Sequence, residues 1–522
     1  MRRRIWKAAS ASVLAVMMIA LATADVGRAQ AGSPAQTHLT PALTALATNS
    51  RPKQQLHVIV AGDGAVQALA GDGAIRHKLP FGAGVAGTVE AGELQLLASQ
   101  PGVTSISLDA PVQLSATGPV SAASLATIYP GRDSASNPWS AGVTGQGVGI
   151  AVIDSGVTPS ADFGNRLTQV RLEGQFGSLD DTVGHGTMVA GVAAGSSPDG
   201  RFIGIAPGAN VYAININRPA GVYASDVITA LKWVFDNAHT HNIRVVNLSL
   251  GEAVKSSYAD SPLDLAIERL WASGVFVAVS AGNLGAGQID YAPANDPLVF
   301  SVGAFDTLDT AGPGDDTLAP WSSSGTTIDG FDKPDLVAPG RHIGAPLPAG
   351  TTLDAQAPGA NRVATGYASI NGTSFAAPQV AGAAAIIFQR HPDYSPDNVK
   401  WVLLAKAGAK VKSSRVASLS LSSSYNLAGA PGRANQGIPA LVCAPGASCL
   451  YGSTVASSWD SSSWNSSSWN SSSWNSSSWN STSWNATADW ASSSWNSSSW
   501  NSSSWNSTSW NGSGSDLFDP WG

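Results

Sequence analysis

The chain has 522 residues, of which 43% are hydrophobic and only 12% are charged, and its formal net charge is −7. This length predicts two or three domains with enough apolar material for a large core, under a surface rich in Ser, Thr, Asn and Gly. The negative net charge argues against nucleic acid as the main partner.

The first 31 residues have the pattern of a signal peptide. A basic start, MRRRIWK, precedes the apolar stretch VLAVMMIALA, which is too short to span a membrane comfortably. The segment AQA (29–31) supplies a small-x-small cleavage site. An uncleaved anchor is the alternative, but we expect a secreted, extracellular protein.

Residues 32–118 predict a small α+β domain. QQLHVIVA (54–61) and VTSISLD (103–109) have the pattern of strands, and GTVEAGELQLLASQ (87–100) that of an amphipathic helix ended by Pro101-Gly102. The low-complexity stretch that follows, 114–138, predicts an exposed linker.

Residues 135–412 predict an α/β domain. Short, almost continuous apolar strands alternate with helical segments such as 224–238 and 261–274, which is typical of a mainly parallel, doubly wound sheet with helices on both faces. In such sheets, sites form at the carboxyl ends of strands. The candidate strands are 148–153, 211–214, 243–250, 275–280 and 298–304.

Four polar residues are predicted at one edge of this sheet. Asp154 and Asn283 each come directly after an apolar strand, and His185 begins a helix between glycines. Ser374 precedes Pro378 and a long apolar run, so it lies at a helix N-terminus, where unpaired N–H groups favour a developing negative charge. Helix capping alone would explain Ser374, but it would not explain why all four converge.

Three blocks in this domain resemble the signature blocks of the subtilisin-like serine peptidases. They are AVIDSGV, GHGTMVAG and NGTSFAAPQVAG, in the order Asp, His, Ser. NLSLG, SAGN, IGIAPGANVYAI and KPDLVAPG add to the likeness, which covers roughly residues 135–410. The resemblance implies the three-layer subtilisin-like fold.

The resemblance also implies catalytic roles. Ser374 resembles the nucleophile, His185 the general base and acid, and Asp154 the carboxylate that orients the imidazole. Asn283 resembles the side-chain donor of the oxyanion hole, together with the Ser374 backbone N–H. Catalysis of this kind uses no cofactor.

Two strand ends are expected to bind the protein or peptide substrate. Ser249, Leu250 and Gly251 resemble the strand that pairs with substrate backbone, although an ordinary buried strand end is the alternative. Ser280, Ala281 and Gly282, just before Asn283, are expected to line the same groove. Met188 stands where many relatives carry a second histidine, which we interpret as a packing change. The family's structural calcium sites have no clear local match.

Residues 32–118 resemble the inhibitory propeptide of the family, a ferredoxin-like βαββαβ unit. Such a domain is an intramolecular inhibitor, and we expect a maturation cut in the linker 119–134, or more broadly between Leu114 and Ala135. An accessory domain kept in the mature protein is the alternative.

The C-terminal part is expected to be a linker, 413–450, and a low-complexity tail, 451–522. Cys443 and Cys449 lie in CAPGASC, as a short disulfide loop or as two free thiols. The tail repeats SSSWN, with tryptophan at every fifth residue except for one slip at NATADW. This composition is typical of disorder, while a compact repeat coil, a cell-surface tether and a glycan-stacking strip are the alternatives.

Two functions follow from the sequence. The first is a secreted serine endopeptidase that works through an acyl-enzyme and is made as a self-processed zymogen. The second is a catalytically silent subtilisin-like scaffold that carries a cell-surface or polymer-binding tail.

Overall fold

The computed structural model describes residues 38–80, 82, 84–114, 127–173, 178–219, 221–310 and 312–441. The predicted signal peptide, the repeat tail and both cysteines lie outside these residues. In the part of the chain that is described, no helix has the length and apolar character needed to cross a membrane.

Residues 38–114, here called the N-terminal domain, form a five-stranded sheet with helices. From β2 onward the elements follow the order β-α-β-β-α-β, and the sheet has the strand order β1-β5-β2-β4-β3. Its apolar side chains form a core of their own. The elements are β1 (His38–Leu39), α1 (Pro41–Asn49), β2 (Gln55–Ala61), α2 (Ala65–Asp72), β3 (Gly73–Leu79), β4 (Gly84–Glu90), α3 (Leu94–Ala98) and β5 (Ser105–Leu108).

The predicted helix 87–100 is wrong in its first half. Residues 84–90 are strand β4, and the helix is limited to Leu94–Ala98 after a short 3-10 turn. Strand β4 pairs with β2 on one side and β3 on the other. These pairings between distant segments outweigh the helical pattern of the local sequence.

The main sheet confirms the predicted parallel α/β fold. Seven strands run parallel in the order β17, β13, β12, β10, β7, β9, β8, and β14 pairs antiparallel with β13. The central strands are completely buried, which explains their continuous apolar sequences. The bounds are β7 (Gly149–Asp154), β8 (Leu167–Val170), β9 (Asn210–Asn215), β10 (Ile243–Leu248), β12 (Phe276–Ser280), β13 (Phe300–Asp306), β14 (Thr317–Leu318) and β17 (Leu336–Pro339).

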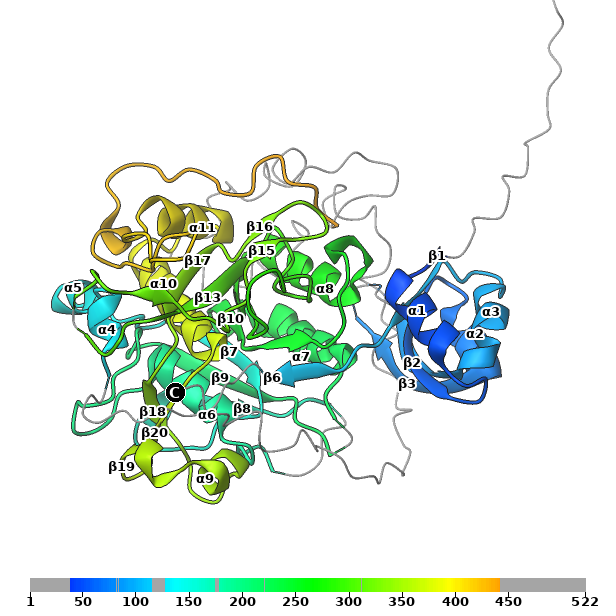
Figure 1. Ribbon diagram of the computed structural model, residues 1–522, viewed down its shortest axis with the longest axis horizontal. Helices are drawn as coiled ribbons and strands as arrows, with labels where there is room; N and C mark the ends of the chain where they lie inside the picture. Colours follow the sequence, from blue (N-terminus) through cyan, green and yellow to red (C-terminus); the bar gives the residue numbers. More distant parts are fainter. Residues whose placement is uncertain are drawn as a thin grey trace, which may run out of the picture. The chain divides into compact units, whose positions relative to one another are not determined.

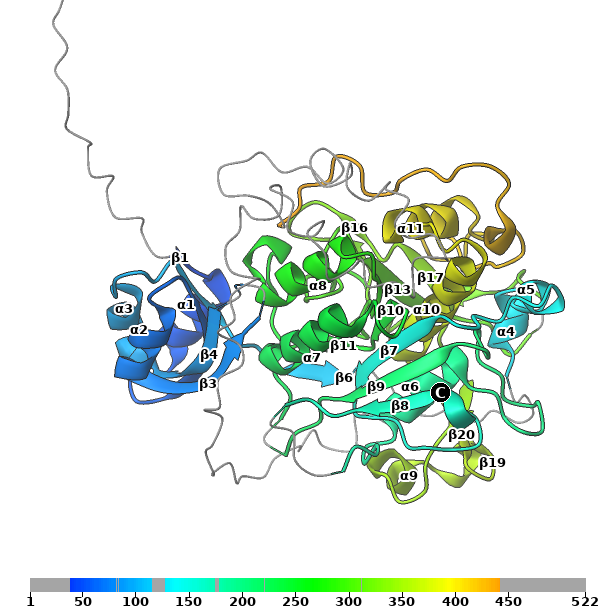
Figure 2. The same ribbon diagram turned by 180° about the vertical axis from the view of Figure 1, so that it is seen from behind.

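Helices cover both faces of this sheet (Figures 1 and 2). Helices α6 and α10 contact each other and the strands on one face, whereas α7 and α8 contact each other on the opposite face. This gives the three layers expected from the sequence. The bounds are α6 (His185–Ala194), α7 (Ala224–Asn237), α8 (Pro262–Ala272), α10 (Thr373–Arg390) and α11 (Pro396–Ala405).

The packed region extends on both sides of the predicted domain 135–412. Helices α4 (Tyr129–Arg132) and α5 (Ser136–Ser140) occupy part of the predicted linker, and Tyr129 is buried in the main core. At the other end Leu419 and Leu421 are buried in the same core. Burial of these apolar side chains stabilises segments whose polar neighbours made them look like linkers.

The remaining strands form small sheets at the periphery. The stretches 306–330 and 341–366 contain much of this structure. The elements are β6 (Val112–Leu114) with β11 (Leu250–Glu252), β15 (Gly325–Thr326) with β16 (Asp332–Lys333), and β18 (Ile343–Pro346) with β20 (Tyr367–Ile370) and β19 (Arg362–Ala364), together with α9 (Thr352–Gln356).

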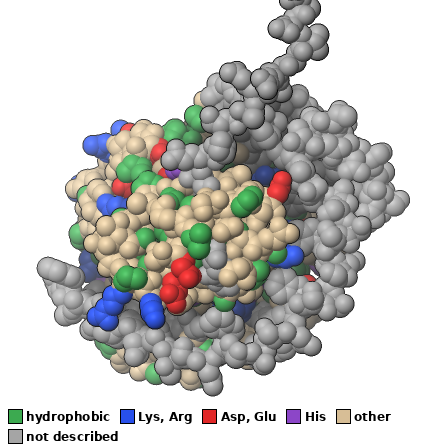
Figure 3. All heavy atoms as spheres, turned by 90° about the vertical axis from the view of Figure 1, so that its right-hand side faces the viewer, with side chains coloured by type: hydrophobic (Ala, Val, Ile, Leu, Met, Phe, Trp, Pro, Cys, Tyr) green, Lys and Arg blue, Asp and Glu red, His purple; other side chains and the backbone are tan. Residues whose placement is uncertain are grey.

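The surface agrees with the low charge content. On the face shown in Figure 3, uncharged polar side chains and backbone predominate among the coloured atoms, and charged side chains form small separate groups.

Candidate active site

Asp154 and His185 meet where β7 ends and α6 begins. Asp154 is the last residue of β7 and His185 is the first residue of α6. His185 Nδ1 lies 2.8 Å from Asp154 Oδ1, and both side chains are buried. The close approach requires glycine at position 186, because a Cβ there would lie 2.2 Å from the carbonyl oxygen of Gly156.

Ser374 lies in the first turn of α10, but Pro378 does not. Pro378 is the sixth residue of the helix, and Ser374 is the second. Proline has no N–H to donate to the carbonyl four residues before it, and that carbonyl belongs to Ser374. Ser249 Oγ donates to this oxygen instead, at 2.8 Å, and Ser374 Oγ lies 3.4 Å from the carbonyl oxygen of Ser249. The proline thus leaves the Ser374 carbonyl available for a hydrogen bond to Ser249, directly after strand β10.

Asn283 presents a hydrogen-bond donor beside this turn. Its Oδ1 accepts the Thr373 N–H at 3.0 Å and the Thr373 hydroxyl at 2.9 Å. Its Nδ2 is buried and has no partner among the described residues. Because Oδ1 is held by Thr373, the side-chain amide has one orientation, with its N–H groups available.

The structure therefore brings the four predicted residues to one edge of the sheet. The ring of Phe375, next to Ser374, lies 5.5 Å from the ring of His185 between centroids. His185 Nε2 has no hydrogen-bond partner in the described part of the chain. With Nδ1 on Asp154, this nitrogen is the one left to exchange a proton.

Comparison with known proteins agrees with this geometry. Residues 145–426 match the model of the subtilase family, Peptidase_S8. The chain belongs to the subtilase family. It is 35% identical over 271 residues to the serine protease AprX of Bacillus subtilis (strain 168), an alignment that covers 50% of this chain and 61% of AprX. It is 34% identical over 255 residues to subtilisin Savinase of Lederbergia lenta, covering 49% of this chain and 81% of that protein.

A solved structure supports the same fold. Fervidolysin from Fervidobacterium pennivorans superposes with a TM-score of 0.59 at 21% identity, covering 77% of this chain and 64% of fervidolysin. This likeness concerns the fold and agrees with the family match of residues 145–426.

In this subtilase, Asp181 is a buried carboxylate that the sequence reading missed. It accepts hydrogen bonds from the N–H groups of Val183 and Gly184 at 3.0 and 2.7 Å, and from the Ser155 hydroxyl at 2.8 Å. Its other oxygen accepts the N–H and the hydroxyl of Thr187, both at 2.8 Å. Burial raises the pKa of Asp181, and these hydrogen bonds act in the opposite direction.

Asp181 connects the two halves of the Asp154–His185 pair. Ser155 Oγ, which donates to Asp181, also lies 3.2 Å from Asp154 Oδ1, and the Ser155 N–H donates to the same oxygen at 2.7 Å. The other donors belong to the loop and first turn that carry His185. The sequence signal was an aspartate four positions before the histidine, which by itself indicates only a turn residue.

The predicted substrate strand is already paired. Strand β11 begins at Leu250 and pairs antiparallel with β6 of the N-terminal domain, so that Leu250, Gly251 and Glu252 face Leu114, Gln113 and Val112. On its side away from β11, strand β6 also contacts Val222, whose carbonyl accepts the Val112 N–H at 2.9 Å. Residues 110–112 therefore lie between two parts of the catalytic domain.

The other predicted residues lie close by or in the core. Ser280 ends β12 and is buried with Ala281, while the Gly282 N–H donates to the Thr373 hydroxyl at 3.2 Å. Met188 is completely buried in the main core, as expected of a packing position.

A lysine occupies an oxygen-lined position in this subtilase. Within the described residues, no group of three or more His, Cys, Asp or Glu side chains could hold a metal ion. Lys400 Nζ lies 2.9, 3.1 and 3.0 Å from the carbonyl oxygens of residues 297, 298 and 299, and 3.1 Å from Asp335 Oδ1. Burial lowers the pKa of Lys400 to about 8, and Asp335 opposes this effect.

Proposed function

We propose that this subtilase is an active, secreted serine endopeptidase made as a self-processed zymogen. The observation that carries the proposal is the buried Asp154–His185 pair, whose Nε2 has no hydrogen-bond partner among the described residues. The imidazole lies 5.5 Å, between ring centroids, from Phe375, which follows Ser374 in the first turn of α10. Protein or peptide chains are the substrates, and the reaction requires no cofactor. Structural calcium is left unassigned.

Each residue has a role in the proposed mechanism. Ser374 Oγ attacks the scissile carbonyl while His185 Nε2 takes its proton, and the imidazolium then protonates the leaving amine. Asp154 holds the Nδ1–H tautomer and stabilises the positive ring. Asn283 Nδ2 and the Ser374 N–H stabilise the oxyanion. Water then hydrolyses the acyl-enzyme with His185 again as base.

The substrate backbone would pair with the strand end at Ser249, Leu250 and Gly251. Ser280, Ala281 and Gly282 would form the opposite wall beside the oxyanion hole. The support is the antiparallel pairing of β11 with β6, which shows that this edge accepts an extended chain.

We further propose that the N-terminal domain is the inhibitory propeptide. Its segment 110–112 occupies the groove, since the Ala253 N–H donates to the carbonyl of Pro111 at 2.9 Å and the Ala224 N–H to that of Ala110 at 3.0 Å. Asp109 binds the start of α7 through the N–H and hydroxyl of Ser225, at 3.1 and 2.9 Å. A carboxylate at a helix N-terminus is favourable there. Because α4 is packed on the core, we place the maturation cut between Leu114 and Tyr129.

Export, the Cys443–Cys449 disulfide and a surface-binding role for the repeat tail rest on sequence alone and stay part of the proposal. The silent-scaffold alternative predicts a disrupted site. The close Asp154–His185 contact and the unpartnered Asn283 Nδ2 argue against it.

The test compares the purified wild-type chain with Ser374→Ala. A fluorophosphonate probe should label the wild type alone, and the variant should neither hydrolyse peptides nor release its propeptide. Substitution of an exposed helix serine, Ser140→Ala, is the matched control and should leave labelling unchanged. Labelling or hydrolysis retained in Ser374→Ala would reject the nucleophile, and maturation of that variant when pure would reject self-cleavage.

A further inference from the structure

The surface of the catalytic domain beneath the propeptide carries acidic side chains that the propeptide meets with basic ones. Asp226, at the start of α7, lies 3.8 Å from Arg76 and 4.0 Å from His77. Asp260 lies 3.0 Å from His38 Nε2. The pattern indicates that this face of the enzyme favours cationic groups.

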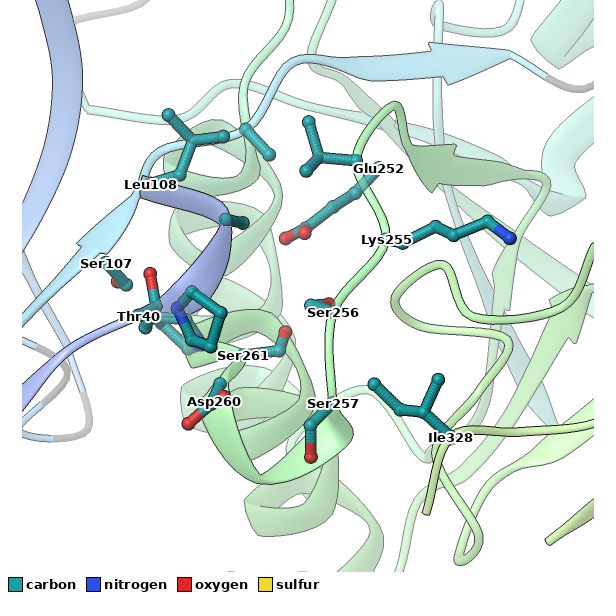
Figure 4. A pocket seen from close by; sticks show the side chains of 15 residues that line it. Thr40, Ser107, Leu108, Glu252, Lys255, Ser256, Ser257, Asp260, Ser261 and Ile328 are labelled. Carbon is teal, nitrogen blue, oxygen red and sulfur yellow. The ribbon is translucent and has the colours of Figure 1, made fainter. Parts of the chain in front are cut away.

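Glu252 is the exception, because it is buried without a cation. It is the last residue of β11, it is 8% exposed, and its Oε1 has no hydrogen-bond partner among the described residues. Its carboxylate points into a cavity of about 240 Å³ between the propeptide and the catalytic domain (Figure 4). A cavity of this size is several times the roughly 30 Å³ that one water takes up in the liquid.

The basic residue among those that line the cavity, Lys255, contacts other groups. Its Nζ lies 3.8 Å from Asp290 and 5.8 Å from the centre of the Tyr291 ring. In Figure 4 its side chain extends away from the carboxylate of Glu252.

The charges around Glu252 are negative. Burial, and after it the charge of Asp109, raise the pKa of Glu252 to about 8. Asp264 of α8 is close enough for the two carboxyl groups to repel each other. A buried carboxylate in such surroundings is stabilised most by a cation that enters the cavity.

Ala110 is the propeptide residue placed to supply a side chain there. It lines the cavity with only a methyl group. It lies two residues before Val112, which faces Glu252 in the strand register, and residues two apart in an extended chain point to the same side. A longer side chain at this position would extend toward the carboxylate.

We propose that Glu252 forms an acidic subsite of the mature enzyme, which binds a lysine or arginine side chain of the substrate at the position that Ala110 takes in the propeptide. The inference rests on the proposed function, in which residues 110–114 occupy the groove as a substrate does. The propeptide leaves this subsite without a cation, so it inhibits the enzyme while remaining releasable. A basic substrate segment on the acyl side of the cut gains an interaction that the propeptide lacks.

The experiment measures kcat/KM of the mature enzyme on quenched peptides with the sequence of residues 107–129, which span the whole stretch in which the cut is placed. Ala110 is replaced by lysine, by norleucine, which has similar length but no charge, or by glutamate. Wild type should prefer lysine over norleucine by about 10- to 100-fold and should cleave the glutamate peptide most slowly. Glu252→Gln should reduce the lysine preference to about 1.

Asp260→Asn is the matched control, because it neutralises an acid on the same wall that has a propeptide partner. It should keep the lysine preference. Added NaCl should weaken the lysine preference in wild type without changing cleavage of the norleucine peptide. This measurement uses wild type alone, so it still tests the subsite if Glu252→Gln fails to mature. Equal preference in wild type and Glu252→Gln, or a preference unaffected by salt, would overturn the subsite. Failure to cleave any of the peptides would instead reject the proposed peptidase function.

Discussion

Replacing Asp181 by asparagine tests whether the buried carboxylate positions the catalytic pair. One carboxylate oxygen becomes an NH₂ group, which cannot accept hydrogen bonds. Both oxygens of Asp181 face backbone donors, two on one side and the Thr187 N–H on the other. The less costly orientation directs the NH₂ at Thr187, and leaves that buried N–H without its acceptor.

The expected magnitude follows from this geometry. One buried unpaired donor costs about 1–3 kcal/mol, so we expect the free energy of unfolding to fall by about 2 kcal/mol. Thr187 is the third residue of α6 and His185 is the first. A displacement of this turn by about 1 Å costs on the order of 10²-fold in rate. The loss should therefore appear as a fall in kcat/KM of about 10- to 100-fold, carried mainly by kcat.

The assay combines denaturant unfolding with peptide kinetics on the purified enzyme. Asp236→Asn changes an exposed carboxylate on α7 that is paired with Lys232, and should stay within about 0.5 kcal/mol of wild type with unchanged kinetics. Wild-type kcat/KM in Asp181→Asn would refute the positioning role, and loss of activity with an unchanged unfolding free energy would refute the hydrogen-bond argument.

Three further outcomes are expected. Asn283→Leu should lower kcat by about 10² to 10³-fold with little change in KM, the range measured when such a donor is removed from a subtilisin; a change confined to KM would reject the oxyanion role. With the N-terminal domain docked, burial and then the charge of Asp109 raise the pKa of Glu252 from 4.5 to about 8. Release of this domain should return the pKa toward 4.5, so the docked form should hold a proton that the free form lacks. The Glu252 contribution to binding of the N-terminal domain should be fully present below about pH 4.5, and its loss should weaken binding by up to about tenfold per pH unit as the pH rises to about 8. Asp109, whose pKa burial raises to about 6, acts in the same direction, whereas His57, whose pKa burial lowers to about 4, acts in the opposite direction. The Glu252 contribution should appear in an inhibition assay as the difference in slope between wild type and Glu252→Gln across this range. Truncation after Gly452 should leave peptidase activity intact and shift the protein from cells to medium, since many weak tail contacts act together; equal partitioning of the two forms would remove the tether.

The main sheet and the candidate site could be predicted because their signals are local. A strand buried on both faces must be apolar throughout, as in β7 and β12, and polar residues that directly follow such strands come to one edge of a parallel sheet. Asp154 and Asn283 are of this kind. The position of Ser374 at a helix N-terminus could be predicted for a related reason, because the apolar run after it indicates a buried helix.

What the tertiary structure alone decided depends on residues that are distant in the sequence. The segment 84–90 is a strand because β2 and β3 lie on either side of it, and residues 127–140 pack because Tyr129 finds the main core. Pro378 leaves the Ser374 carbonyl without a donor from the helix, and the hydroxyl of Ser249, which is distant in the sequence, donates to it. Nothing in the local sequence marks Glu252 as buried, because burial and charge depend on what packs from outside the local chain.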